Sequence, residues 1–232
     1  MIFKTFLVLV LLLVSGCAGQ RLPSIPFDRA GGNVQSIALV TPATPDKPIL
    51  ISLAPVTPLP IFIGIIGTLA DQSVQKDHAA HFAEILANHD FRPQPLLVAD
   101  ITQVLQAKGY AVTIVEADRS GQDFLAQYPP GMPPAGDAYL DVVLANHGYG
   151  ATTTFDPYQP LIGLKFRLVR TSDNKVLMQD TFAYSNIGHA VRPEPKYDYQ
   201  HYVDFSSDQD RSIEGIKEGL QRGADAIGSA LN

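Results

Sequence analysis

The chain has 232 residues, of which 46% are hydrophobic and 17% are charged, so it can bury one sizeable core and is expected to form a single domain. Its 17 Lys and Arg against 23 Asp and Glu give a formal net charge of −6 at pH 7, which excludes the basic surface that nucleic-acid binding requires. The single cysteine excludes an internal disulfide.

The amino terminus has the layout of a secretory signal peptide. Lys4 supplies a positive charge, residues 6–14 are apolar, and small residues follow. The apolar stretch is shorter than the roughly 20 residues that a membrane-spanning helix needs. The residues that end it, Val14-Ser15-Gly16-Cys17, resemble the lipobox of bacterial lipoprotein precursors. The resemblance implies that residues 1–16 are a signal peptide and that Cys17 carries a diacylglycerol as the first mature residue.

The same resemblance implies where the protein is held. Acyl chains on both the sulfur and the new amino terminus attach a protein firmly, where a single chain would exchange. Ala18 stands where enterobacterial lipoproteins retained in the inner membrane have aspartate. This implies the outer membrane, facing the periplasm, with the inner membrane as the alternative because sorting rules differ among bacteria. With Cys17 lipidated, no thiol remains for catalysis or for a metal.

Residues 17–33 mix Pro, Gly and charged residues without periodicity, and we expect a lipid anchor and tether there. A single periplasmic domain is expected over residues 34–232. In it, residues 34–41 and 110–116 form two strands, and residues 95–108 form a helix between them. A helix between two strands indicates a βαβ unit, in which the strands lie parallel in one sheet.

The second half of the chain predicts an antiparallel meander and a closing helix. Strands are expected at residues 138–146, 161–170 and 175–184. Ser207 and Asp210 resemble a capping box at the start of the helix. Its apolar stripe consists of Ile213, Ile216, Leu220, Ile227 and Leu231. The fold class is therefore α/β (α+β): a sandwich of one mixed sheet with helices packed against it.

This element order resembles the small α/β domain shared by the amino-terminal domain of TolB and by periplasmic lipoproteins of the curli-secretion type. The phrases Lys108-Gly109-Tyr110 and Ala138-Tyr139-Leu140-Asp141 carry the same resemblance. It covers roughly residues 34–231 and implies an envelope protein that scaffolds or assembles. No functional residue of this chain follows from it.

Residues 48–70 contain no charged residue and are long enough to cross a bilayer. Pro55, Pro58 and Pro60 argue against a continuous membrane helix, because each removes a backbone donor that lipid cannot replace. Two alternatives stay open: a buried strand at residues 49–54 with a helix start at Pro60, or an exposed apolar surface for assembly, docking or contact with the membrane. The residues of this candidate assembly surface are Ile61, Phe62, Ile63, Ile65, Ile66 and Leu69.

The sequence contains none of the motifs that mark nucleotide, dinucleotide, serine-hydrolase, zinc-protease or calcium sites, so we expect no cofactor and no enzymatic activity. His78, His81 and Glu84 recur every three residues on a predicted helix. At that spacing the three side chains fan out over about 120° instead of converging, so no metal site is predicted.

Two groups of residues are candidates for recognition. Tyr197, Tyr199 and Tyr202 form either a recognition surface, since rigid rings bury area at low entropic cost, or a layer packed on the sheet beside the last helix. His147 follows a predicted strand in Asn-His-Gly-Tyr-Gly and is either a displayed binding group or part of a strand stop.

Two functions remain. The first is a lipid-anchored structural or interaction protein that associates with itself or with an envelope partner, through residues 61–69 and the tyrosine segment. The alternative is a periplasmic small-ligand-binding protein or hydrolase with a pocket between residues 118–136 and His147. The absence of catalytic motifs favours the first function.

Overall fold

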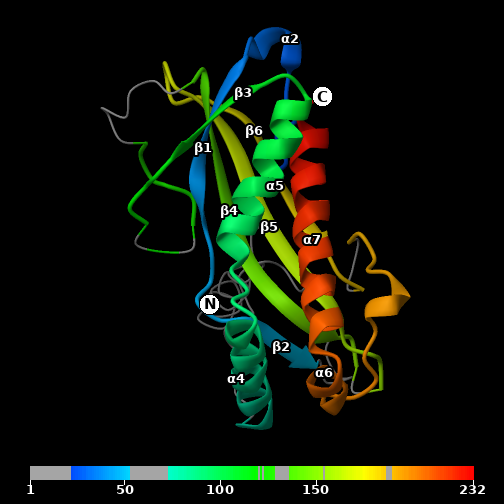
Figure 1. Cartoon of the computed structure of the whole chain (residues 1–232). Coiled ribbons are helices and arrows are strands. Elements are labelled where there is room, and N and C mark those ends of the chain that lie inside the picture. Colours follow the sequence, from blue (N-terminus) through cyan, green and yellow to red (C-terminus); the bar gives the residue numbers. More distant parts are fainter. Residues whose placement is uncertain are drawn as a thin grey trace, which may run out of the picture.

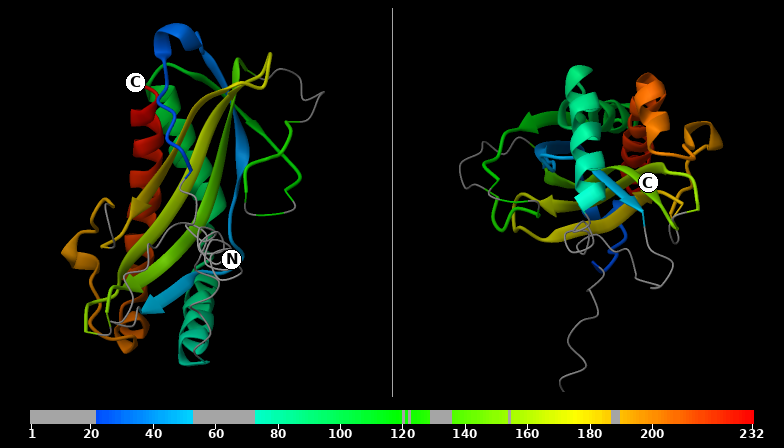
Figure 2. Two further views of the ribbon diagram at one scale, coloured as in Figure 1. Left: turned by 180° about the vertical axis from the view of Figure 1, so that it is seen from behind. Right: turned by 90° about the horizontal axis from the view of Figure 1, so that it is seen from below.

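The computed structural model describes residues 22–52, 73–119, 121, 123–128, 136–153, 155–186 and 190–232. Cys17, the rest of the lipobox and the candidate assembly surface at residues 61–69 lie outside these ranges. Helices α4 (Ser73–Asn88), α5 (Pro93–Ala107) and α7 (Gln209–Ala230) cover one face of a mixed sheet (Figures 1 and 2), which confirms the α/β fold. None of the described helices combines the length and the apolar character that crossing a bilayer requires.

The described residues form six strands in one sheet, in the order β3-β1-β4-β5-β6, with β2 beside β4. The strands are β1 (Ser36–Ala43), β2 (Ile49–Ser52), β3 (Ala111–Val115), β4 (Ala138–Ala151), β5 (Gln159–Arg170) and β6 (Val176–Tyr184). The central strand β1 pairs in parallel with β3 and β4, which confirms the βαβ unit. Strands β4, β5 and β6 form the predicted antiparallel meander.

The helices form where their apolar periodicity predicts. In α5, Leu97, Ile101 and Leu105 are buried, and Gly109 follows with φ +89°, the left-handed conformation that ends many helices. The predicted apolar stripe of α7 is buried from Ile213 to Leu231. These contacts place the larger core between the helices and the sheet.

The predicted cap of α7 was wrong by one residue. Ser207 belongs to the short helix α6 (Val203–Ser207), and its hydroxyl donates to the carbonyl oxygen of Asp204 at 2.9 Å. The cap is Asp208, whose carboxylate accepts from the backbone N–H of Arg211 at 3.4 Å. Because Ser207 is held inside α6, the neighbouring carboxylate is left to satisfy the free N–H groups of α7.

The opposite face of the sheet carries a second, smaller cluster. Ala38, Val40 and Tyr139 are buried there against Leu125 and Tyr128, which come from the chain that follows β3. The described part of residues 116–128 therefore covers a sheet face on which none of the described helices packs.

The chain just before the first strand is attached to the sheet. Ile25 and Gln179 of β6 exchange two backbone hydrogen bonds, of 2.7 and 2.9 Å. The side-chain amide of Gln179 also donates to the carbonyl oxygen of Pro23 at 3.0 Å. Helix α2 (Arg29–Gly32) follows, and Phe27 packs against the core. The described part of the predicted tether thus lies along the edge of β6 (Figure 2).

Candidate functional site

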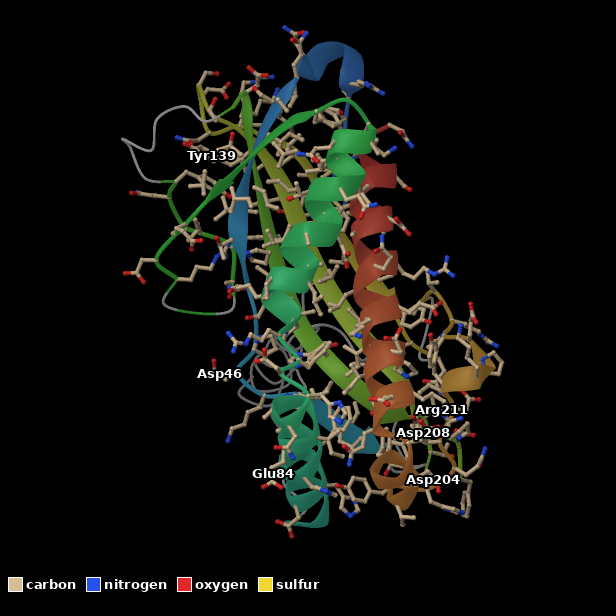
Figure 3. All side chains as sticks on the ribbon, viewed as in Figure 1. Asp46, Glu84, Tyr139, Asp204, Asp208 and Arg211 are labelled. Carbon is tan, nitrogen blue, oxygen red and sulfur yellow. The ribbon has the colours of Figure 1, made fainter. Side chains whose placement is uncertain are left out.

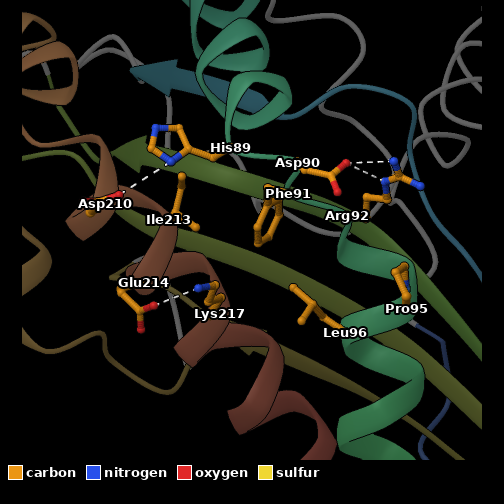
Figure 4. Close-up of a pocket in the computed structure, with 10 residues that line it drawn as sticks. All are labelled: His89, Asp90, Phe91, Arg92, Pro95, Leu96, Asp210, Ile213, Glu214 and Lys217. Carbon is orange, nitrogen blue, oxygen red and sulfur yellow. Dashed lines mark hydrogen bonds and ion pairs between the residues drawn. The ribbon is translucent and has the colours of Figure 1, made fainter.

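A groove of about 580 Å³ opens between the α4–α5 turn and the first turns of α7 (Figure 4). The turn is sharp because Asp90 adopts φ +49° and Pro93 begins α5 directly afterwards. The apolar side chains of the groove are Phe91, Pro95, Leu96 and Ile213. Its charged and polar side chains are His89, Asp90, Arg92, Asp210, Glu214 and Lys217.

The charged side chains of the groove pair with one another. The imidazole Nδ1 of His89 lies 3.5 Å from the carboxylate of Asp210 (Figure 4). Lys217 reaches Glu214 at 2.9 Å on the same helix. Exposed pairs of this kind contribute little to stability. An apolar floor with a charged rim suits the binding of a partner's side chains more than bond-breaking chemistry.

The tyrosine segment lies beside this groove, at the start of α7. Tyr197 and Tyr199 are buried. The hydroxyl of Tyr199 donates to the carbonyl oxygen of Asp208 at 3.0 Å, and the guanidinium of Arg211 lies 4.4 Å above its ring. Figure 3 shows Asp208 and Arg211 together at this end of the helix. These two tyrosines therefore serve packing in the described structure, which leaves Tyr202 as the accessible ring.

Tyr202 joins two histidines that the sequence placed far from it. Its ring stacks on the imidazole of His78 with centroids 3.6 Å apart, and its hydroxyl lies 2.5 Å from Nδ1 of His81. Burial and the nearby Glu84 carboxylate raise the pKa of this hydroxyl, so it stays protonated at neutral pH. Across the described residues, no group of three His, Cys, Asp or Glu side chains is arranged to hold a metal ion.

The sequence predicted that His147 follows the end of a strand. In the structure, His147 lies inside strand β4. Strand β4 continues to Ala151 through an irregularity between Leu144 and Asn146, and His147 pairs opposite Ile162 of β5. The imidazole is only 2% exposed and sits on the helix side of the sheet with Ile162. The described part of residues 116–128 covers the other side, away from His147. Residues 129–135 of the predicted pocket lie outside the described residues.

His147 is expected to make stability depend on pH. Burial lowers its pKa from 6.5 to about 4, and its Nδ1 has no hydrogen-bond partner among the described residues. Between these values the unfolded chain binds a proton that the native chain does not, so stability falls as the pH is lowered from 6.5 to 4.

We expect this group to contribute at most about 3 kcal/mol to the difference in unfolding free energy between pH 7 and pH 4. Urea titrations of the native protein and of His147→Leu at both pH values measure this contribution. The variant should lose clearly less stability on acidification; equal losses would contradict the assignment.

A buried charge cluster on the sheet face opposite the described helices was not predicted. Asp141 is fully buried, and its carboxylate accepts from Arg119 at 2.5 Å, from the Tyr128 hydroxyl at 2.8 Å and from the Leu125 N–H at 2.9 Å. The guanidinium of Arg167 lies 3.6 Å away. Burial and the Asp141 charge raise the pKa of Tyr128, which keeps its hydroxyl a donor. The cluster fastens the described part of residues 119–128 over the sheet.

No protein-family model and no curated protein matches this chain. Among solved structures, a PelC dodecamer from Paraburkholderia phytofirmans is 14% identical, with 92% of this chain and 97% of that chain covered and a TM-score of 0.38. Protein XCC0632 from Xanthomonas campestris is 14% identical, with 91% and 89% covered and a TM-score of 0.41. A putative neuraminyllactose-binding hemagglutinin homolog from Helicobacter pylori is 12% identical, with 93% and 92% covered and a TM-score of 0.34. The chain is thus similar to several bacterial proteins at a level that identifies no function.

Proposed function

We propose that this chain is a lipid-anchored protein of the bacterial cell envelope. Cys17 attaches it to the periplasmic face of the outer membrane, and its α/β domain assembles with copies of itself or with another envelope protein. The observation that carries the proposal is Val14-Ser15-Gly16-Cys17, which contains the only cysteine and directly ends an apolar run.

The attachment of the amino-terminal chain to β6 supports this proposal. Leu22, the first described residue, is 22 − 17 = 5 positions after Cys17. Five positions span at most roughly 17 Å of extended chain. A lipid on Cys17 would therefore keep the domain against the membrane surface, which suits a protein that assembles there.

The candidate assembly surface at residues 61–69 and the groove beside α7 are the surfaces that we propose for assembly, whereas residues 49–52 of the apolar run at residues 48–70 form β2, in which Leu50 and Ile51 are buried. The run includes the candidate assembly surface at residues 61–69, whose residues carry no charge. The ligand-binding or hydrolase alternative has less support, because the described structure keeps His147 and residues 116–128 on opposite faces of the sheet.

Fractionation of cells tests the anchor. The full-length protein should sediment with membranes and require detergent for release, whereas Cys17→Ala should not. Gln20→Ala is the matched control, because it lies after the lipobox and should leave membrane attachment unchanged. Membrane attachment of Cys17→Ala equal to that of the native protein would rule out the lipid as the anchor.

Light scattering on the detergent-solubilised full-length protein tests assembly. A defined oligomer that becomes a folded monomer with Ile63→Asp and Ile66→Asp would support residues 61–69 as an assembly surface. A native monomer together with an unfolded variant would place these residues in the core and count against it.

A further inference from the structure

Strand β3 forms an open edge of the sheet. Within the described ranges it pairs only with β1, and its sequence, Ala-Val-Thr-Ile-Val, contains no charge and no proline. Ala111 and Thr113 are exposed, and Ile114 is 49% exposed. Natural proteins usually protect such edges with lysine, proline, a bulge or a covering segment, because an unpaired strand attracts another strand.

The pairing with β1 determines which backbone groups of β3 face outward. The N–H of Ala111 donates to the carbonyl oxygen of Gln35, so Ala111, Thr113 and Val115 direct their backbone groups toward β1. Alternation then directs the N–H and C=O groups of Val112 and Ile114 away from the sheet. These four groups are in position to receive one further strand.

A shallow apolar groove accompanies this edge on the helix side. It has a volume of about 490 Å³ and lies between α5 and β3, with Val98, Ala99, Thr102 and Ile114 among its lining residues. Val112 and Ile114 are the β3 residues that face the helices, since they pair with Ile37 and Leu39 of the larger core. A strand added to β3 would place alternate side chains over this groove.

The opposite edge of the sheet is engaged by the chain itself. On β6, Ile25 pairs with Gln179, and Val191 pairs with Tyr184. A head-to-tail ring of sheets would need a free β6 edge, whereas pairing of β3 with β3 needs only the edge that is open. Two identical edges can meet about a two-fold axis.

We propose that two copies of this chain pair through β3, antiparallel, about an axis at Thr113. This inference rests on the self-association in the proposed function and gives it a surface distinct from residues 61–69. In this register Val112 of one copy lies opposite Ile114 of the other, and the two exchange both backbone hydrogen bonds. Antiparallel pairing also brings the basic Lys108 of each copy to the same end as the acidic Glu116 of the partner copy.

Thr113 itself provides the test. In the proposed register the two Thr113 residues form a non-hydrogen-bonded pair, with Cα atoms about 4.5 Å apart. That separation permits a disulfide. Thr113→Cys in the full-length protein, with Cys17 lipidated, would carry the only free thiol, and the periplasm is oxidising. We expect a membrane-bound dimer on non-reducing gels that becomes a monomer on reduction.

Ala111→Cys is the matched control. It lies on the same strand and the same face, but the two copies of residue 111 would be separated by about four residues, or roughly 13 Å, which is too far for a disulfide. Co-expression of Ala111→Cys with Val115→Cys should restore the cross-link, because these two positions pair in the proposed register.

The results distinguish a wrong proposal for β3 pairing from a wrong proposal for the lipid anchor at Cys17. A membrane-bound Thr113→Cys monomer, equal cross-linking of Ala111→Cys, or a cross-link to a protein of different mass would overturn the proposal while leaving the anchor intact. A cross-link in the native protein would instead indicate an unmodified Cys17 and would count against the proposed function.

Discussion

Replacing Asp141 with asparagine is expected to lower the free energy of unfolding by about 3–5 kcal/mol. The side chain of Asp141 is inaccessible to solvent, and those of its partners Arg119 and Arg167 are only 9% and 18% exposed. An asparagine keeps the shape but removes the charge, which leaves two largely buried guanidinium groups without their shared anion. Urea unfolding followed by circular dichroism measures the loss.

Asp123→Asn is the control for this prediction. Asp123 pairs with Lys165 at 3.1 Å on the same side of the sheet, but its side chain is 85% exposed. Loss of an exposed pair should cost less than about 1 kcal/mol. Similar effects of the two substitutions would show that burial of Asp141 does not determine the stability of this face.

Gly148→Ala is expected to lower the free energy of unfolding by about 2–4 kcal/mol. Gly148 has φ +147°, a conformation that residues with a side chain rarely adopt. A Cβ at this position would also overlap the backbone carbonyl oxygen of Ile49 in β2. Because the clash is with backbone, it cannot be relieved by a rotamer change, and the pairing of β2 with β4 would have to open.

Gly109→Ala is the control that separates the cost of backbone strain from the cost of the steric clash. Gly109 also has a positive φ, of +89°, but a Cβ there would meet no atom within 4 Å. Its replacement should cost about 1 kcal/mol, from backbone strain alone. The same urea titration compares the two variants, and equal losses at both glycines would contradict the close approach of β2 to Gly148.

The fold was predictable where local periodicity and pairing agree. The stripe of α7 follows from residues that lie close together in the sequence, and it is buried as predicted. The end of β4 was not predictable in this way. Asn146 and Gly148 indicate a strand stop locally, but β5 and β2 continue to pair with β4 as far as Gly150 and Ala151.

The charge cluster depends on contacts that no local pattern contains. Arg167 lies directly opposite Asp141 in the β4–β5 pairing, but Arg119, 22 positions before Asp141, reaches it only because the described part of residues 116–128 crosses the sheet. Arg167 is a charged residue that alternates with the apolar residues of β5, yet its guanidinium donates to the Tyr128 hydroxyl and the Leu125 carbonyl oxygen. One sequence signal was present: Asp141 interrupts an otherwise apolar strand, and a buried carboxylate requires a partner.

Mass spectrometry of the amino-terminal peptide tests the lipid anchor most directly. Trypsin should release residues 17–21, Cys-Ala-Gly-Gln-Arg, from the mature membrane-bound protein. We expect a peptide that begins at Cys17 and carries the mass of a diacylglycerol on its sulfur together with an acyl chain on its amino group. A mature peptide with an unmodified Cys17 thiol, or one that begins at another residue, would contradict it.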